Sequence, residues 1–154
     1  MTAAHLPHHA SDTEIAAHQQ AETHRYVMHF PAHAPRTGDP HYAAFEAYRR
    51  HTQATAVCYV GERVGFAYCS KGPLELHHGV LEFAVANAAD PKALHRDFPD
   101  ITEDATPEQI ATWLESSPSE FRWLCAFHHR GHGGAHTASH ADWTAQLYVP
   151  GLIS

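Results

Sequence analysis

Hydrophobic and polar positions alternate in several short runs after residue 55, and between these runs the apolar positions recur at helical spacing. A period of two is typical of half-buried strands, and recurrence at three and four residues is typical of amphipathic helices. The runs that favour strands are 55–60, 66–68, 74–78 and 121–125. The runs that favour helices are about 80–88, 91–96, 107–115 and 139–149. The pattern therefore predicts a mixed α+β chain.

The segment before residue 55 is predicted to be a helical arm. Ser11-Asp-Thr-Glu14 has the spacing of a capping box, which predicts a helix over about 12–26. Asp39-Pro40 supplies an N-cap and a first-turn proline for a second helix, which is expected to run to about Gln53. The expected organisation is a disordered tail, a helical arm and a main domain: 1–10, 11–54 and 55–154.

Length and charge limit the partners that the chain can bind. Its 154 residues, 44% of them hydrophobic, are enough for one compact domain with a modest core. With no run of 18 apolar residues, we expect a cytoplasmic protein with no membrane partner. The net charge of −7 argues against a large phosphate-binding surface. Nucleic acid would need local contacts from bound metal, protonated imidazoles and four arginines: Arg49, Arg50, Arg122 and Arg130.

The three cysteines are too few for a disulfide framework and are expected to be reduced. Cys58 and Cys69 flank a segment predicted to be a hairpin with its turn at 61–65, and Cys125-Ala-Phe-His128 has the two-residue gap of a zinc knuckle. Two such pairs suit a tetrahedral structural zinc. The alternative is that the cysteines are small buried apolar residues.

Histidine is the compositional outlier, with 17 residues. His77 and His78 are adjacent at the end of a predicted strand, so they face opposite sides and one can hold a metal while the other faces a substrate. A second constellation combines His77 and His129 with either His132 or His136. A helix after His129 would slightly favour His132, one turn on, whereas a bent loop through the glycines would bring in His136. The alternative is a set of unrelated histidines.

Two motifs carry a resemblance to a known family. Leu74-Glu-Leu-His-His78 resembles the first motif of HNH endonucleases, in the His-His variant of colicin-type nucleases. Glu120-Phe-Arg-Trp-Leu-Cys-Ala-Phe-His-His129 is similar to the second, Asn-Leu-x-x-Leu-Cys-x-x-Cys-His. The region from Cys58 to about Leu152 is also similar to HNH-type proteins of actinobacteria and their phages. The resemblance implies a ββα-metal fold with a zinc-knuckle hairpin and a helical insertion over about 79–119.

The resemblance implies that His77 and His129 bind a catalytic ion and that His78 is the general base. It also places Cys125 and His128 with an upstream pair, here Cys58 and Cys69, around structural zinc. The chain departs from the family at Glu120, which stands in place of the central Asn and cannot donate a side-chain hydrogen bond.

Two further residues are candidates for supporting roles. Glu82 is expected one turn beyond His78 and could orient His77 or help to bind metal. Arg130 could steady a phosphate oxygen of a bound substrate.

The resulting prediction is an endonuclease that hydrolyses phosphodiester bonds of DNA, with nicking as the natural outcome of one base and one ion. The catalytic ion would be Mg²⁺, Mn²⁺, Ni²⁺ or Zn²⁺, beside the structural zinc. Expected partners are DNA, and phage packaging proteins or a second copy of the chain. The main alternative is a zinc-organised nucleic-acid-binding or phage assembly module without catalysis, and a metal-storage or metal-sensing protein is another.

Overall fold

The computed structural model describes most of the chain after residue 41 and short stretches before it: 19–21, 23, 25, 27, 29–32, 42–117 and 120–153. The expected disordered tail, the capping box and Asp39-Pro40 lie outside these residues. Within the helix expected over 12–26, the described residues are exposed and form no helix, so the prediction is wrong for them. An isolated helix with no buried face is marginal in water, which accounts for the difference.

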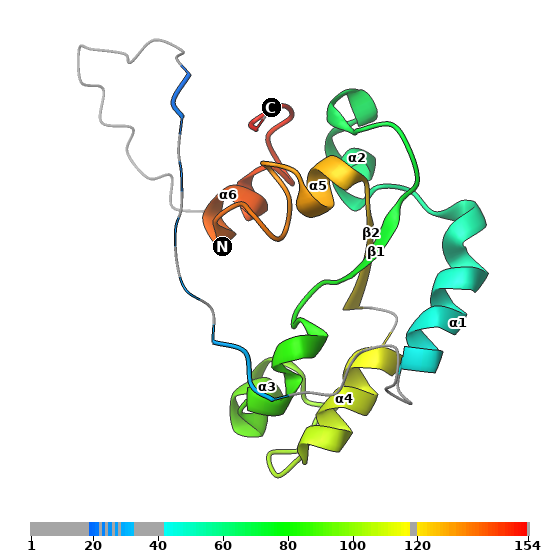
Figure 1. The fold of residues 1–154 in the computed structure, drawn as a ribbon, viewed down its shortest axis with the longest axis vertical. Coiled ribbons are helices and arrows are strands. Elements are labelled where there is room, and N and C mark those ends of the chain that lie inside the picture. The colour runs from blue at the N-terminus through cyan, green and yellow to red at the C-terminus, as the bar shows by residue number, and fades with distance from the viewer. Residues whose placement is uncertain are drawn as a thin grey trace, which may run out of the picture.

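A two-stranded antiparallel sheet lies at the centre of the described fold (Figure 1). It pairs β1 (Glu75–His78) with β2 (Phe121–Leu124), and both strands lie where the alternation predicted strands. The register sets His77 opposite Arg122 and His78 opposite Phe121. Because successive side chains point to opposite faces, His77 and His78 lie on different sides of the sheet.

Helix α1 (Tyr42–Thr52) packs on the face that carries His78, and the 3₁₀ helix η2 (Gln53–Thr55) continues it. The ring of Phe45 meets Phe121 edge-on at 5.2 Å between centroids and stacks on His78 at 4.8 Å. The helix predicted to run to about residue 53 is therefore confirmed over its described part, and it closes one face of the sheet.

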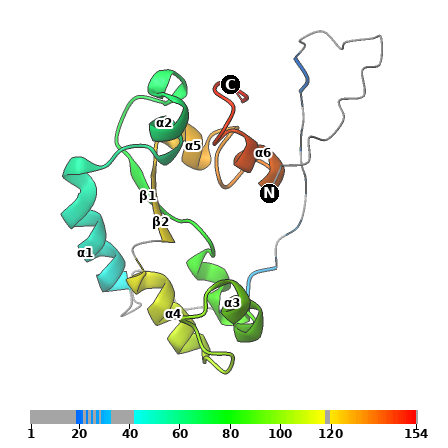
Figure 2. The same cartoon turned by 180° about the vertical axis from the view of Figure 1, so that it is seen from behind.

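The connection between the strands is a helical unit with its own core. Its elements are η4 (Phe83–Ala88), α3 (Pro91–Asp97) and α4 (Pro107–Ser116). Thr106 caps α4 through a capping box with Gln109, as its sequence position indicates. Ile110 and Leu114 of α4 are buried against Phe83. Figures 1 and 2 show this unit at one end of the sheet, with α2, α5 and α6 at the other.

The strands predicted over 55–60 and 66–68 are wrong. The chain instead forms α2 (Tyr59–Val64) and the 3₁₀ helix η3 (Phe66–Tyr68), so the zinc-knuckle hairpin is absent from this described segment. Strand propensity is a weak preference, and here burial of Cys58 and Val60 against Leu124 overrides it. The expected turn at 61–65 lies largely within α2, which ends at Val64 and is followed by the capping residue Gly65 with φ 97°.

Beyond β2 the chain forms α5 (Ala126–Arg130) and α6 (His140–Ala145), so the helix expected over 139–149 is shorter than predicted. The architecture is α+β, which confirms the predicted class at that level. In the part of the chain that the structure describes, no helix has the length and apolar character needed to cross a membrane.

Candidate metal centres

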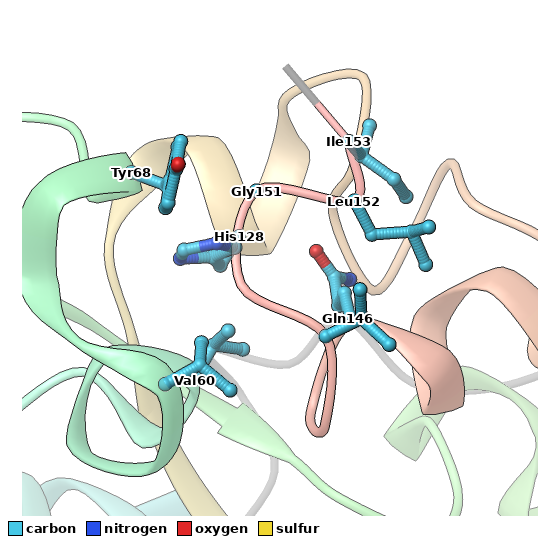
Figure 3. Close-up of a pocket in the computed structure, with 9 residues that line it drawn as sticks. Val60, Tyr68, His128, Gln146, Gly151, Leu152 and Ile153 are labelled. Carbon is cyan, nitrogen blue, oxygen red and sulfur yellow. The ribbon is translucent and has the colours of Figure 1, made fainter. Parts of the chain in front are cut away.

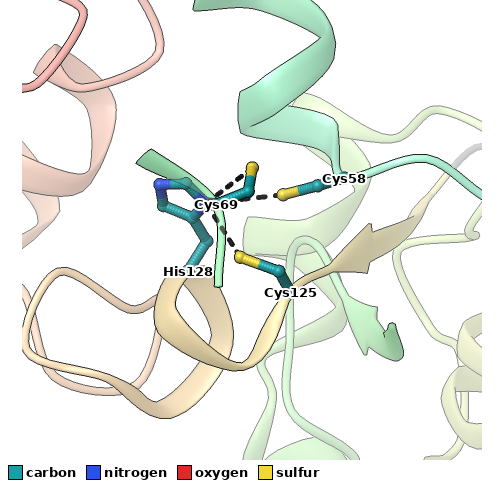
Figure 4. A group of neighbouring side chains, drawn as sticks. All are labelled: Cys58, Cys69, Cys125 and His128. Carbon is teal, nitrogen blue, oxygen red and sulfur yellow. Dashed lines mark hydrogen bonds between the residues drawn. The ribbon is translucent and has the colours of Figure 1, made fainter. Parts of the chain in front are cut away.

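Cys58, Cys69, Cys125 and His128 form one compact group, which we name the cysteine centre (Figure 4). His128 Nδ1 lies 3.2 Å from Cys125 Sγ, 3.4 Å from Cys58 Sγ and 3.8 Å from Cys69 Sγ. Tetrahedral zinc, with bonds of about 2.3 Å to sulfur and about 2.0 Å to nitrogen, sets such S···N edges at roughly 3.5 Å. The four side chains can therefore hold a metal ion such as zinc.

Four different elements bring these ligands together. Cys58 precedes α2, Cys69 follows η3, Cys125 joins β2 to α5, and His128 lies on α5. A Cβ atom at Gly61 of α2 would lie 2.8 Å from Cys69 Sγ, so glycine is required for this close approach.

The electrostatic environment of the thiols and of the imidazole in the cysteine centre favours binding of a cation. Burial, and then the charges of Cys58 and Cys125, raise the pKa of the Cys69 thiol to about 12. Burial alone would raise the pKa of Cys125, but hydrogen bonds from the backbone of His128 and from Ser70 outweigh it and lower that pKa. Burial also lowers the pKa of His128, which favours the neutral imidazole that ligates metals.

The C-terminal segment closes the outer side of the cysteine centre. His128 lines a cavity of about 10 Å³ with Val60, Gln146 and Leu152 (Figure 3). Such a volume is about that of one water-sized probe, so this side holds no room for a substrate. Cys58, Cys125 and His128 are 1–3% exposed, and the centre is therefore placed to stabilise the fold.

His77, His129 and His136 form a second group, the histidine centre, in which one ligand atom from each lies within 4.8 Å of the others. Nε2 of His129 and Nε2 of His136 are 3.0 Å apart. Their side chains are 14% and 38% exposed, against 11% for His77. Unlike the cysteine centre, this group is open to solvent on one side.

The third histidine of this group is His136, one of the two alternatives that the sequence left open, and not the slightly favoured His132. Helix α5 ends at Arg130, and the chain bends back through Gly131–Gly134. The His136 amide then donates to the carbonyl of His129 at 3.2 Å. A Cβ atom at Gly134 would lie 2.6 Å from that carbonyl, so the return needs glycine there. His132 is exposed and lies outside the group.

Two carboxylates flank the histidine centre. Glu75 accepts a hydrogen bond from His129 Nδ1 and pairs with Arg130, while Glu82 Oε1 lies 3.4 Å from His77 Nδ1 and 3.6 Å from His136 Nε2. Glu82 thus lies beside His77, but it precedes η4 in an extended conformation and is not on the helix expected from about residue 80. Glu75 was missed, although its position two residues before His77 on a strand places both side chains on one face.

Burial, with smaller contributions from His136 and His129, lowers the pKa of His77 to about 3. The imidazole of His77 is therefore neutral at physiological pH and available to a metal. Burial opposes ionisation of Glu75, but the hydrogen bond and charge of His129, together with Arg130, lower its pKa overall. A carboxylate that holds the outer nitrogen of a histidine fixes the ring orientation and strengthens it as a ligand.

His78 lies on the other face of the sheet, away from the histidine centre. It is 3% exposed, its ring stacks on Phe45, and its Nε2 is 3.2 Å from Glu115 Oε1 of α4. His77 and His78 point to opposite faces of the sheet, as expected. The face that carries His78, however, is covered by α1 and α4. This position does not suit the general base that the family resemblance implied.

Glu120 and Arg130 are the remaining residues for which the sequence suggested a supporting role. The backbone carbonyl of Glu120 accepts a hydrogen bond from Gly79 at 2.6 Å, so main-chain atoms join the two strand ends. Arg130 is exposed and pairs with Glu75, at the edge of the histidine centre.

Comparison with protein-family models, with curated proteins and with solved structures finds no match to this chain.

Proposed function

We propose that this protein is a metal-dependent endonuclease that hydrolyses phosphodiester bonds of DNA with an HNH-type ββα-metal core. The observation that carries the proposal is the histidine centre, where three imidazoles converge beside two carboxylates on a partly open face. The order β1, β2, α5, with the cysteine centre at the junction of β2 and α5, also supports it.

The donor set fits a divalent first-row ion. Neutral imidazoles suit zinc, nickel and related metals, and three protein ligands leave room for a substrate. When bound, such an ion supplies positive charge that stabilises the phosphate oxygens. His77, His129 and His136 would hold it, and Glu75 keeps His129 oriented through Nδ1.

Glu82 replaces His78 as the base in this proposal, because Glu82 lies at the open side whereas His78 is buried. Its Oε1 accepts a proton from the attacking water while the water oxygen bonds to phosphorus and the bond to the leaving oxygen breaks. The leaving oxygen then takes a proton from solvent.

Nicking of supercoiled plasmid by the zinc-loaded protein, with Mg²⁺, Mn²⁺ or Ni²⁺ added, tests this function. His136→Ala and His132→Ala form a matched pair: only His136 belongs to the histidine centre, so only His136→Ala should abolish nicking. If neither variant loses activity, or if both lose it equally, the proposed centre is wrong.

The base is tested with Glu82→Gln and with a core variant that removes the His78 imidazole. Glu82→Gln should lower the nicking rate by about 10²–10⁴-fold, the usual contribution of a general base. His78→Phe combined with Glu115→Leu replaces the buried pair by apolar residues and should keep activity. If the folded double variant loses nicking while Glu82→Gln remains active, His78 and not Glu82 is the general base.

The burial of His78 favours a second candidate, a zinc-organised binding module without catalysis. That protein would bind DNA and retain zinc at the cysteine centre, and it would cleave no plasmid under any added metal.

A further inference from the structure

A groove lies against β2, and residues of β2, α1, η2 and α2 line it. Its volume is about 300 Å³, at the lower end of the range for small-ligand sites. Aromatic rings form much of its lining, with two threonines, an arginine and a glutamate among the other residues. Tyr48, Val57, Tyr59, Glu62, Arg122 and Trp123 are among the lining residues.

Arg122 connects this groove to the histidine centre. On β2 it is paired directly opposite His77, and paired residues of an antiparallel sheet share one face. Its guanidinium lies 4.8 Å from the centre of the Tyr59 ring, and its Nη1 donates to the carbonyl of Phe121 at 2.8 Å. A positive charge is thus held in an aromatic groove one strand away from a candidate metal ligand.

We propose that this groove binds one nucleotide of the strand whose phosphate lies at the histidine centre. The inference rests on the proposed function for the identity of that strand. A nucleotide joins a flat, largely apolar base to an anionic phosphate, and the groove offers the complement of both. The base packs against the half-buried ring of Tyr48, above the core residue Trp123, and the phosphate pairs with Arg122.

Charge and space favour this occupant. The groove has room for a base and sugar but not for a folded partner. Glu62 also lines it, yet Glu62 is exposed, whereas Arg122 is held against Tyr59 and the strand backbone. The chain carries a net charge of −7, so a local arginine next to the reaction site is the kind of contact that an anionic strand requires.

The test is fluorescence anisotropy of a short, labelled single strand with a nuclease-resistant phosphorothioate backbone, added to the zinc-loaded full-length protein. Arg122→Gln keeps the aliphatic stem and removes the charge. It should raise Kd about tenfold. The slope of log Kd against log salt should also fall by about 0.7, the value for one lost phosphate contact on a single strand. A purely structural role would leave that slope unchanged.

Matched controls separate the groove from general charge and folding effects. Arg96→Gln removes the same charge from an exposed position on α3, which does not line the groove, and should leave Kd and slope as in wild type. Val57→Glu places a negative charge in the groove and should weaken binding. Val149→Glu, at a position of similar exposure (46% against 44%), should not. Thermal melts identify any variant that fails to fold.

Equal effects of Arg122→Gln and Arg96→Gln, or no effect of Val57→Glu, would overturn the inference. The assay needs no hydrolysis, so its failure and that of the nuclease proposal are distinct. Arg122-dependent binding without plasmid nicking supports the groove and refutes the nuclease, whereas nicking without Arg122-dependent binding refutes the groove alone. A ribose strand of the same sequence shows whether the site prefers RNA, and the dependence on Arg122 should hold for the strand that binds.

Discussion

The buried pair of His78 and Glu115 should make a large contribution to stability that depends on both partners. Their side chains are 2% and 1% exposed, and 3.2 Å separates Nε2 from Oε1. Removing one partner of such a pair leaves the other desolvated, at a cost of about 3–5 kcal/mol. In a protein of this size, each kcal/mol of lost stability lowers Tm by about 2–4 °C, so Tm should fall by about 6–20 °C.

Glu115→Leu and His78→Phe should each show this loss, and the double variant should recover most of it. Apolar residues of similar volume often replace a buried pair without loss, and a phenyl ring at position 78 can keep the aromatic contacts with Phe45 and Phe121. Thermal melts by circular dichroism, with urea titrations for the free energies, complete a double-mutant cycle.

Glu103→Ala is the matched control, because this glutamate of the same helical unit is 63% exposed and lies 4.0 Å from its nearest imidazole partner. It should change stability by no more than about 0.5 kcal/mol. Additive losses in the double variant, or single variants that melt like wild type, would refute a buried, coupled pair.

Three further predictions concern the cysteine centre. Cys125→Ser should lose its bound zinc, measured by mass spectrometry, and should no longer melt cooperatively. The reason is that binding of a structural ion contributes to the free energy of folding. Retention of full zinc content would contradict this prediction. Zinc binding to the metal-free protein should release protons, since a pKa of about 12 keeps Cys69 protonated until the metal displaces the proton. Apparent zinc affinity, measured by competition with a chelator, should therefore rise as pH increases through neutrality. An affinity that does not change with pH would exclude protonated thiols in the metal-free protein. Gly61→Ala should lower the free energy of unfolding by about 1–3 kcal/mol and weaken zinc retention, because the new methyl group would meet Phe66 at 2.5 Å and Cys69 Sγ at 2.8 Å. A melting curve identical to that of wild type would show that α2 and Cys69 are packed less closely than this.

Elements with strong local signals could be predicted from the sequence. Thr106-Pro107 carries its own cap, and the alternation at Leu74–His78 and Phe121–Cys125 matches β1 and β2 within a residue. The four residues of the cysteine centre could be predicted as well, because two pairs of thiol and imidazole donors in a reduced protein form the ligand set that tetrahedral zinc prefers. These features depend on chemistry that is local to a few residues.

Tertiary structure decided the rest. The apolar run at 55–60 favours a strand, but burial of Cys58 and Val60 against Leu124 accompanies a helix that begins at Tyr59. The choice of His136 over His132 depended on where α5 ends and how the glycines return the chain.

The sequence by itself determined that His77 and His78 face opposite ways, since the period of a strand is two. Which of these faces would be open depended on contacts with residues distant in the chain. Phe45 of α1 and Glu115 of α4 cover His78, whereas His129 and His136 meet His77 at a surface that stays accessible. Periodicity along a strand distinguishes its two faces, but only long-range packing decides which one is buried.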